Sequence, residues 1–154
     1  MTGLHFAYGA NMNRAVMRKY APDARALGKA ELAGHRFVIT ADGYGSVEPA
    51  PAQTVHGVLW RITPRDRVLL DVWENVGGGL YRGEMLAVRG AGGHAVALVY
   101  FARPGREGRP KAGYMELVIA AAREWDLPQS YIGALQGWSS RPPGPDVRKI
   151  GEFR

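Results

Sequence analysis

One acidic side chain, Glu74, stands where a carboxyl group could work as a general acid or base. The helical pattern of this region ends at Glu74, and Trp73 and Val76 flank it. The negative end of a helix and apolar neighbours both disfavour the charged carboxylate, which favours proton exchange near neutral pH. Three glycines at 77–79 follow directly and would let a substrate approach or a lid close. The alternative is a merely solvated acid, which is also the ordinary interpretation of Asp71, one turn earlier.

The stretch at residues 4–13 predicts a binding loop. An apolar strand ends at Gly9, and an amphipathic helix begins within four residues, after Asn13. The first amides of a helix have no intrahelical acceptor and carry partial positive charge, so they could bind a carboxylate or phosphate. Gly9 would permit a positive φ and the close approach of a ligand. The alternative is that Gly9 and Asn11 only turn the chain.

Other common chemistries find little support. The four histidines, at positions 5, 35, 56 and 94, lie in or beside predicted strands without metal-ligand spacing, so we interpret them as partly buried strand residues. The chain has no cysteine, which excludes disulfides and thiol nucleophiles. Ser46 lacks the flanking pattern of a nucleophile elbow, and no Lys-Ser/Thr pair follows the glycines at 77–79 as in a P-loop. The sequence therefore predicts no metal site.

Composition limits the class of protein. The 154 residues, of which 46% are hydrophobic and 22% charged, predict one globular domain at residues 1–138 and a Pro-rich, poorly ordered tail at 139–154. The formal net charge is +6, but the basic residues, mostly Arg, are scattered singly, so we expect small anionic substrates rather than nucleic acid. We see no signal peptide and no apolar run long enough to cross a membrane, which makes the cytoplasm the expected location.

The order of expected elements predicts an α+β fold. Two strands joined by a tight hairpin at Ala33-Gly34 precede a long excursion at 41–54, and a central strand follows at 55–62. Thr63 and Pro64 then open a helix. The remaining expected elements are strands at 80–89 and 94–102 and helices at 114–125 and 128–135. Together they predict a small mixed, mostly antiparallel β-barrel with peripheral helices.

An ordered set of short motifs carries a resemblance to a known family. The loop Phe6-Ala7-Tyr8-Gly9-Ala10-Asn11-Met12 resembles the binding loop of the γ-glutamylcyclotransferase-like family, usually Tyr-Gly-Ser-Asn-Leu/Met. That family continues with a Gly-Val-Val/Leu-Trp strand and a helix ending in Leu-Asp-x-x-Glu. The corresponding segments here are Gly57-Val58-Leu59-Trp60 and Leu70-Asp71-Val72-Trp73-Glu74. Further matches are the glycines at 77–79, Tyr81, Tyr100, Tyr114 and Leu127-Pro128-Gln129-Ser130-Tyr131, so the resemblance spans residues 4–138.

The resemblance implies a barrel of about six strands and a reaction without cofactor, in which a γ-glutamyl compound is cleaved to 5-oxoproline. The substrate's own α-amine attacks its γ-carbonyl, and Glu74 would move both protons. The implied partner is a small γ-glutamyl molecule, bound by a monomer or homodimer. The substrate-binding residues implied by the family pattern are Phe6, Ala7, Tyr8, Gly9, Ala10, Asn11, Tyr81, Tyr100 and Tyr114.

One residue departs from the family pattern. Ala10 stands where the family commonly has Ser, so one hydroxyl donor is missing from the loop, although backbone amides would remain. This difference bears on substrate identity more than on the type of reaction. The alternative to an enzyme is a non-catalytic protein on the same fold that binds a small anion or a partner.

Overall fold

Five strands close into a barrel in the computed structural model, which describes residues 2–139. The strands are β1 (Gly3–Ala7), β2 (Arg25–Ile39), β3 (Gly45–Ile62), β4 (Tyr81–Gly90) and β5 (Gly93–Ala102). Their order around the barrel is β1-β3-β2-β4-β5; β1 and β5 pair in parallel and all other neighbours are antiparallel. The predicted mixed, mostly antiparallel barrel is confirmed, with five strands rather than about six.

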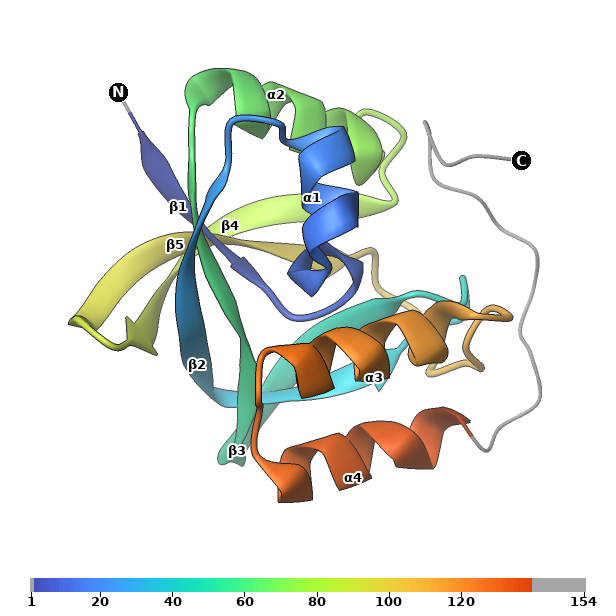
Figure 1. Cartoon of the computed structure of the whole chain (residues 1–154). Helices are drawn as coiled ribbons and strands as arrows, with labels where there is room; N and C mark the ends of the chain where they lie inside the picture. Colours follow the sequence, from blue (N-terminus) through green and yellow to red (C-terminus); the bar gives the residue numbers. More distant parts are fainter. Residues whose placement is uncertain (1, 140–154) are drawn as a thin grey trace.

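The helices flank the barrel in two pairs (Figure 1). They are α1 (Arg14–Tyr20), α2 (Pro64–Trp73), α3 (Tyr114–Glu124) and α4 (Gln129–Ser139), and a single 3₁₀ turn, η1 (Ala10–Met12), precedes α1. The first pair is α1 and α2, and the second is α3 and α4, which lie side by side. The turn η1 contacts both α1 and α3, so the connection after β1 lies between the two pairs.

The predicted hairpin at Ala33-Gly34 is wrong. β2 runs through this point as one strand, and Gly34, at φ +73°, lies where the pairing of β2 with β3 shifts register. The hairpin is formed instead by β2 and β3 around residues 40–44, where Thr40 N–H donates to Tyr44 O at 3.0 Å. A glycine at positive φ fits a bulge as well as a turn, so the local sequence could not distinguish them.

The predicted excursion at 41–54 is therefore mostly strand. Residues 45–54 form the first part of β3, including the short strand expected near Ser46 and Val47. Pro49 faces His35, directly after the register shift of β2, a position where proline is tolerated in a sheet. The central strand expected at 55–62 is confirmed, because this part of β3 pairs with β1 on one side and β2 on the other.

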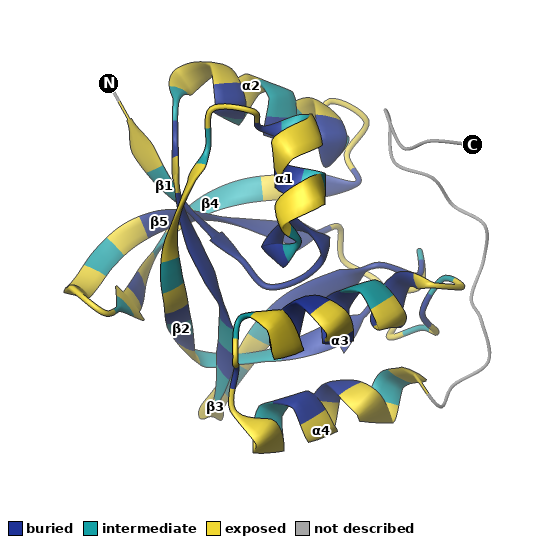
Figure 2. Cartoon of the chain, in the orientation of Figure 1, coloured by how far each residue is buried: buried dark blue, intermediate teal, exposed yellow. Residues whose placement is uncertain are grey.

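Buried residues are frequent along β1 and the half of β3 that pairs with it, whereas the tip of the β4–β5 hairpin is exposed (Figure 2). Gly57 makes the close approach of these two strands possible. A Cβ at this position would overlap the carbonyl oxygen of Ala7 and lie 2.9 Å from the ring of Phe6. The glycine of the Gly57-Val58-Leu59-Trp60 motif thus lets the end of β1 approach β3 closely.

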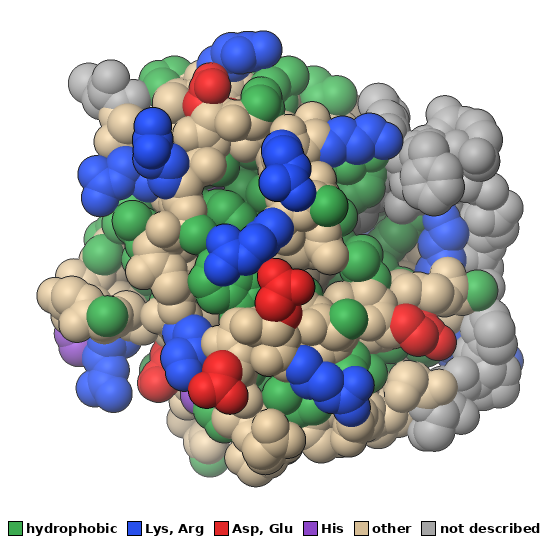
Figure 3. Space-filling model, in the orientation of Figure 1, with side chains coloured by type: hydrophobic (Ala, Val, Ile, Leu, Met, Phe, Trp, Pro, Cys, Tyr) green, Lys and Arg blue, Asp and Glu red, His purple; other side chains and the backbone are tan. Residues whose placement is uncertain are grey.

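Three further expectations from the sequence concern the basic residues, membrane-spanning segments and the C-terminal tail. On the face shown in Figure 3, Lys and Arg side chains lie among other residues and form no single basic patch. No helix within residues 2–139 is long and apolar enough to span a membrane. The helix expected at 128–135 extends to Ser139, the first residue of the predicted tail, and the rest of that tail, 140–154, lies outside the described residues.

We predict that Gly57→Ala lowers the free energy of unfolding by about 1–3 kcal/mol, since an inserted methyl group must displace the backbone of β1. Gly77→Ala is the matched control, because a Cβ at residue 77 would meet nothing within 4 Å. It should change stability by less than about 0.5 kcal/mol. Chemical denaturation of both variants tests the prediction, and equal stabilities would contradict it.

Candidate active site

The start of α2 is set by local sequence. Thr63 is its N-cap: the side chain accepts from Asp66 N–H at 3.1 Å, and the Asp66 carboxylate accepts from Thr63 N–H at 3.0 Å. Pro64 occupies the first turn, as predicted. Asp66 also accepts from Asp23 N–H at 3.1 Å, which ties the turn after α1 to the same end of α2.

The end of α2 places Glu74. Asn75 adopts the left-handed conformation, with φ +53°, and its N–H donates to Val72 O at 3.0 Å. Val76 N–H donates to Asp71 O at 2.9 Å. This pair of bonds is a Schellman motif with asparagine in the position more often taken by glycine. Glu74 is consequently held as the C-cap residue, 5% exposed, with its side chain directed into the protein.

The loop after β1 has a different backbone from the one expected. Gly9 has φ −128°, so the prediction of a positive φ is wrong. The absence of a side chain at Gly9 instead leaves room for Tyr114. The Tyr114 hydroxyl oxygen lies 2.6 Å from where a Cβ of residue 9 would be, and 2.8 Å from the corresponding point at Gly45. The expected helix then begins after Asn13, whose side chain accepts from Val16 N–H at 2.9 Å.

Asn11 and Glu74 meet inside the protein. Asn11 Nδ2 donates to Glu74 Oε2 at 3.0 Å and lies 3.3 Å from His5 Nε2. On its other side, Asn11 Oδ1 accepts from Trp73 Nε1 at 3.0 Å. His5, 2% exposed, has its Nδ1 at 3.1 Å from Leu98 O on β5. Burial lowers the pKa of His5 below the ordinary value of 6.5, which favours the neutral ring.

Three buried tyrosines direct their hydroxyls to fixed acceptors. Tyr8 donates to Tyr100 O at 2.6 Å, Tyr81 donates to Gly45 O at 2.5 Å, and Tyr100 donates to Asp71 Oδ1 at 2.6 Å. Burial is the main cause that raises the pKa of each of these hydroxyls. They therefore stay protonated at neutral pH and act as hydrogen-bond donors rather than as bases.

Asp71 is more than the solvated acid expected from the sequence. Besides the Tyr100 hydroxyl, it accepts from Arg67 Nε at 3.2 Å, one turn earlier on α2. The carboxylate thus joins α2 to β5 and fixes the ring of Tyr100. Asp71 and Glu74 lie three residues apart and have different partners: Asp71 accepts from the Tyr100 hydroxyl, and Glu74 accepts from Asn11.

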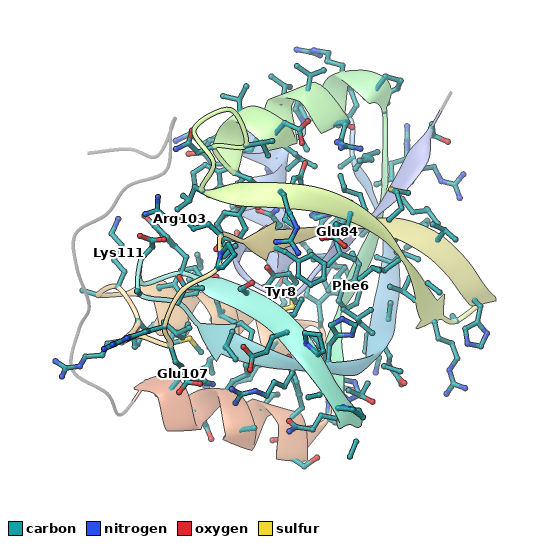
Figure 4. The ribbon with its side chains drawn as sticks, turned by 180° about the vertical axis from the view of Figure 1, so that it is seen from behind. Phe6, Tyr8, Glu84, Arg103, Glu107 and Lys111 are labelled. Carbon is teal, nitrogen blue, oxygen red and sulfur yellow. The ribbon has the colours of Figure 1, made fainter. Side chains whose placement is uncertain are left out.

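The connection after β5 carries Tyr114 to the loop and is held by ion pairs. Arg103 binds Asp42 through two nitrogens, at 2.9 and 2.6 Å, and Arg36 binds Glu107 at 3.0 Å. Figure 4 shows Arg103 and Glu107 away from Phe6 and Tyr8, which lie among the strands. These contacts tie the connection that precedes α3 to β2 and to the turn after it.

The structure brings every proposed site residue into one pocket. It also adds two residues that the sequence interpretation missed. Gly45 lies on β3, inside the region expected to be a loop. His5 was interpreted only as a strand residue. Its contact with Asn11 exists because η1 folds the chain back toward β1, which the local sequence does not show. The described residues that line the pocket are His5, Phe6, Ala7, Tyr8, Gly9, Ala10, Asn11, Gly45, Glu74, Tyr81, Tyr100 and Tyr114.

The other histidines lie apart from this pocket. His35 and His56 are partly buried on strands, and the His56 ring packs against Tyr131 at 4.9 Å between centroids. His94 is exposed at the start of β5. Within residues 2–139, no group of three or more His, Cys, Asp or Glu side chains could hold a metal ion.

Comparison with solved structures identifies the fold. A γ-glutamyl cyclotransferase superposes with a TM-score of 0.84 at 21% identity, over 99% of this chain and 95% of that one. The human protein LOC79017, described as uncharacterized, gives 0.84 at 22% identity over 98% and 94%. YkqA from Bacillus subtilis gives 0.79 at 23% identity, over 94% of this chain and 56% of its own. The barrel and its helices therefore have the γ-glutamyl cyclotransferase fold.

Family membership follows from the sequence. The family model for the AIG2-like family matches residues 54–135, which is more than half of the chain. The chain belongs to the AIG2-like family. No curated protein matches it significantly. The matched region begins in β3 and ends in α4, so it contains Glu74 and the three tyrosines at 81, 100 and 114.

We predict that Gly9→Ala costs about 1–3 kcal/mol of stability, because its methyl group meets the Tyr114 hydroxyl. In a Tyr114→Phe background, which removes that oxygen, the same substitution should cost much less. A double-mutant cycle should give a coupling energy of about 0.5–3 kcal/mol, measured by denaturation. A coupling energy of zero would show that the close approach of Tyr114 is not what excludes a side chain at residue 9.

The lowered pKa of His5 predicts that the stability of the protein depends on pH. Its folded-state pKa lies below 6.5, so between these values the unfolded chain binds a proton that the folded chain does not. The stability contributed by this group is fully present above pH 6.5 and falls as the pH drops toward the lower pKa. The wild type should therefore lose up to about 1.4 kcal/mol more per pH unit than His5→Phe as the pH falls below 6.5. Identical pH dependence of unfolding in the two proteins would refute this.

Proposed function

We propose that the protein is a γ-glutamyl cyclotransferase-type enzyme, which converts a γ-glutamyl compound into 5-oxoproline and a free amine. The observation that carries the proposal is the buried carboxylate of Glu74, held by Asn11 in a pocket lined by the loop after β1. Among the described lining residues there is no other acid and no Lys or Arg, so Glu74 is the carboxyl group that the lining offers for proton transfer. The likeness of the whole fold to a γ-glutamyl cyclotransferase supports the same conclusion.

The proposed reaction needs one group that can both take and give a proton. The substrate's α-amine nitrogen attacks its γ-carbonyl carbon, which closes the five-membered ring, and Glu74 accepts the proton that this nitrogen loses. Glu74 then donates that proton to the leaving nitrogen as its bond to the γ-carbon breaks. The products are 5-oxoproline and the amine, and the carboxylate is restored. Because the nucleophile belongs to the substrate, the protein contributes orientation and proton transfer, and no cofactor.

The other pocket residues would orient the substrate. In this proposal, backbone amides of Gly9 and Ala10 bind the substrate carboxylate or the developing oxyanion. Phe6, Ala7 and Tyr8 form the wall beside them. The methyl group of Ala10 offers no hydroxyl there, so the substrate of this chain is expected to differ from that of family members with serine.

Asn11 and three tyrosines complete the lining of the proposed pocket. The side chains of Asn11, Tyr81, Tyr100 and Tyr114 line it on the sides formed by η1, β4, β5 and α3, respectively. Because the hydroxyls of Tyr81 and Tyr100 already donate to Gly45 and Asp71, these rings would contact substrate mainly through their faces and edges. We propose that the protein acts in the cytoplasm as a monomer or homodimer.

Glu74→Gln should lower turnover by about 10²–10⁴-fold, since the amide keeps the shape of the side chain but cannot accept and return a proton. The measurement is release of 5-oxoproline from a panel of γ-glutamyl amino acids and γ-glutamyl amines. Glu84→Gln on β4 is the matched control, because its carboxylate pairs with Arg82 at 2.5 Å and does not line the pocket. Its turnover should equal that of the wild type.

Two outcomes would oppose the proposal. Unchanged turnover in Glu74→Gln would exclude the proton-transfer role of this residue. Absence of turnover on every compound, together with tight binding of a small anion, would favour the non-catalytic alternative on the same fold.

A further inference from the structure

The side-chain amide of Asn11 has a determined orientation. The indole nitrogen of Trp73 can only donate, and it lies 3.0 Å from Asn11 Oδ1. The amide oxygen therefore faces Trp73, and the two hydrogens on Nδ2 face away from it. Nδ2 lies 3.0 Å from Glu74 Oε2 and 3.3 Å from His5 Nε2, so each hydrogen has one acceptor.

The protonation of His5 is determined in the same way. Its Nδ1 lies 3.1 Å from the carbonyl oxygen of Leu98, which can only accept, so Nδ1 carries the hydrogen. In the neutral ring, Nε2 is then the acceptor for Asn11. A proton on Nε2 would instead face the N–H of Asn11, donor against donor. The edge-on packing of the His5 ring against Tyr100, at 5.5 Å between centroids, holds the ring in this plane.

We propose that His5 is a positioning residue for Glu74: by accepting one N–H of Asn11, it aims the other at the carboxylate. An amide group is planar, so fixing the direction of one N–H fixes the second. Without an acceptor at His5 Nε2, Asn11 keeps only its bond to Trp73 as an independent constraint on how the amide is turned. The inference rests on the proposed function, because it assigns His5 a part in holding the group that transfers protons.

Three substitutions at residue 5 separate this role from packing. His5→Gln places an amide oxygen near the position of Nε2, where it can accept from Asn11. His5→Asn places an N–H near the position of Nδ1, so it keeps the bond to Leu98 and loses the acceptor. His5→Phe fills the space and keeps neither bond. His56→Phe is the matched control, since that ring also packs against an aromatic side chain but lies outside the pocket.

The expected result is a fall in kcat with little change in KM. His5→Asn and His5→Phe should lower kcat by about 10–10²-fold, as expected when a reacting group is displaced, while KM changes by less than about threefold. His5→Gln should retain kcat to within about fivefold, and the control should match the wild type. Equal losses in all three variants would assign His5 to packing alone. Wild-type kcat in His5→Phe, with Glu74→Gln inactive, would overturn the positioning role and leave the proposed function standing.

A second measurement does not depend on turnover. Long-range proton–nitrogen NMR of the histidine rings should show His5 with a proton on Nδ1 and none on Nε2 at pH 7. The side-chain amide signals of Asn11 should shift in His5→Asn and His5→Phe and be largely kept in His5→Gln. A proton on Nε2, or Asn11 signals unmoved in His5→Phe, would overturn the inference. If no γ-glutamyl compound is turned over, the proposed function fails, and these spectra still decide whether His5 orients Asn11.

Discussion

The hydrogen bond from Asn11 to Glu74 joins two parts of the chain that are 63 residues apart. It links the turn after β1 with the cap of α2, and both ends are buried. A buried carboxylate is strongly disfavoured unless it accepts hydrogen bonds, and this contact supplies Glu74 with a donor while it holds the loop against the helix end. Asn11 is held in the orientation that makes this bond, because its oxygen accepts from Trp73 and its second N–H faces His5 Nε2.

The barrel makes this contact possible through close approaches of backbone. Gly57 lets the end of β1 lie on β3, and Gly9 and Gly45 leave room for the hydroxyl of Tyr114. From the end of β1, one 3₁₀ turn carries Asn11 back over His5. The end of α2 reaches the same place because Asn75 stops the helix in the left-handed conformation. The pocket is therefore the meeting point of a strand end, a helix end and the first residue of α3.

Short-range patterns predicted a large part of this fold. The capping box at Thr63, the helix that begins after Asn13 and the strands at 80–89 and 94–102 follow rules that act within a few residues, and the structure contains them. The interpretation of Gly34 failed because a positive φ serves a hairpin and a bulge equally. It is the pairing of β2 with β3 along 13 registered positions that selects the bulge. The expected positive φ at Gly9 failed for a similar reason, since the constraint there comes from Tyr114, far along the chain.

The sequence by itself determined which residues belong together: the loop at 6–12, Glu74 at the end of a helix, and the tyrosines at 81, 100 and 114. Helix caps, strand periodicity and an ordered set of motifs are local properties, so the amino-acid sequence alone reveals them. Only the tertiary structure decided what each polar group does. The partners of Tyr8, Tyr100 and His5 lie between 29 and 93 residues away. A hydrogen bond depends on distance and direction, and for partners so far apart only the closed barrel supplies both.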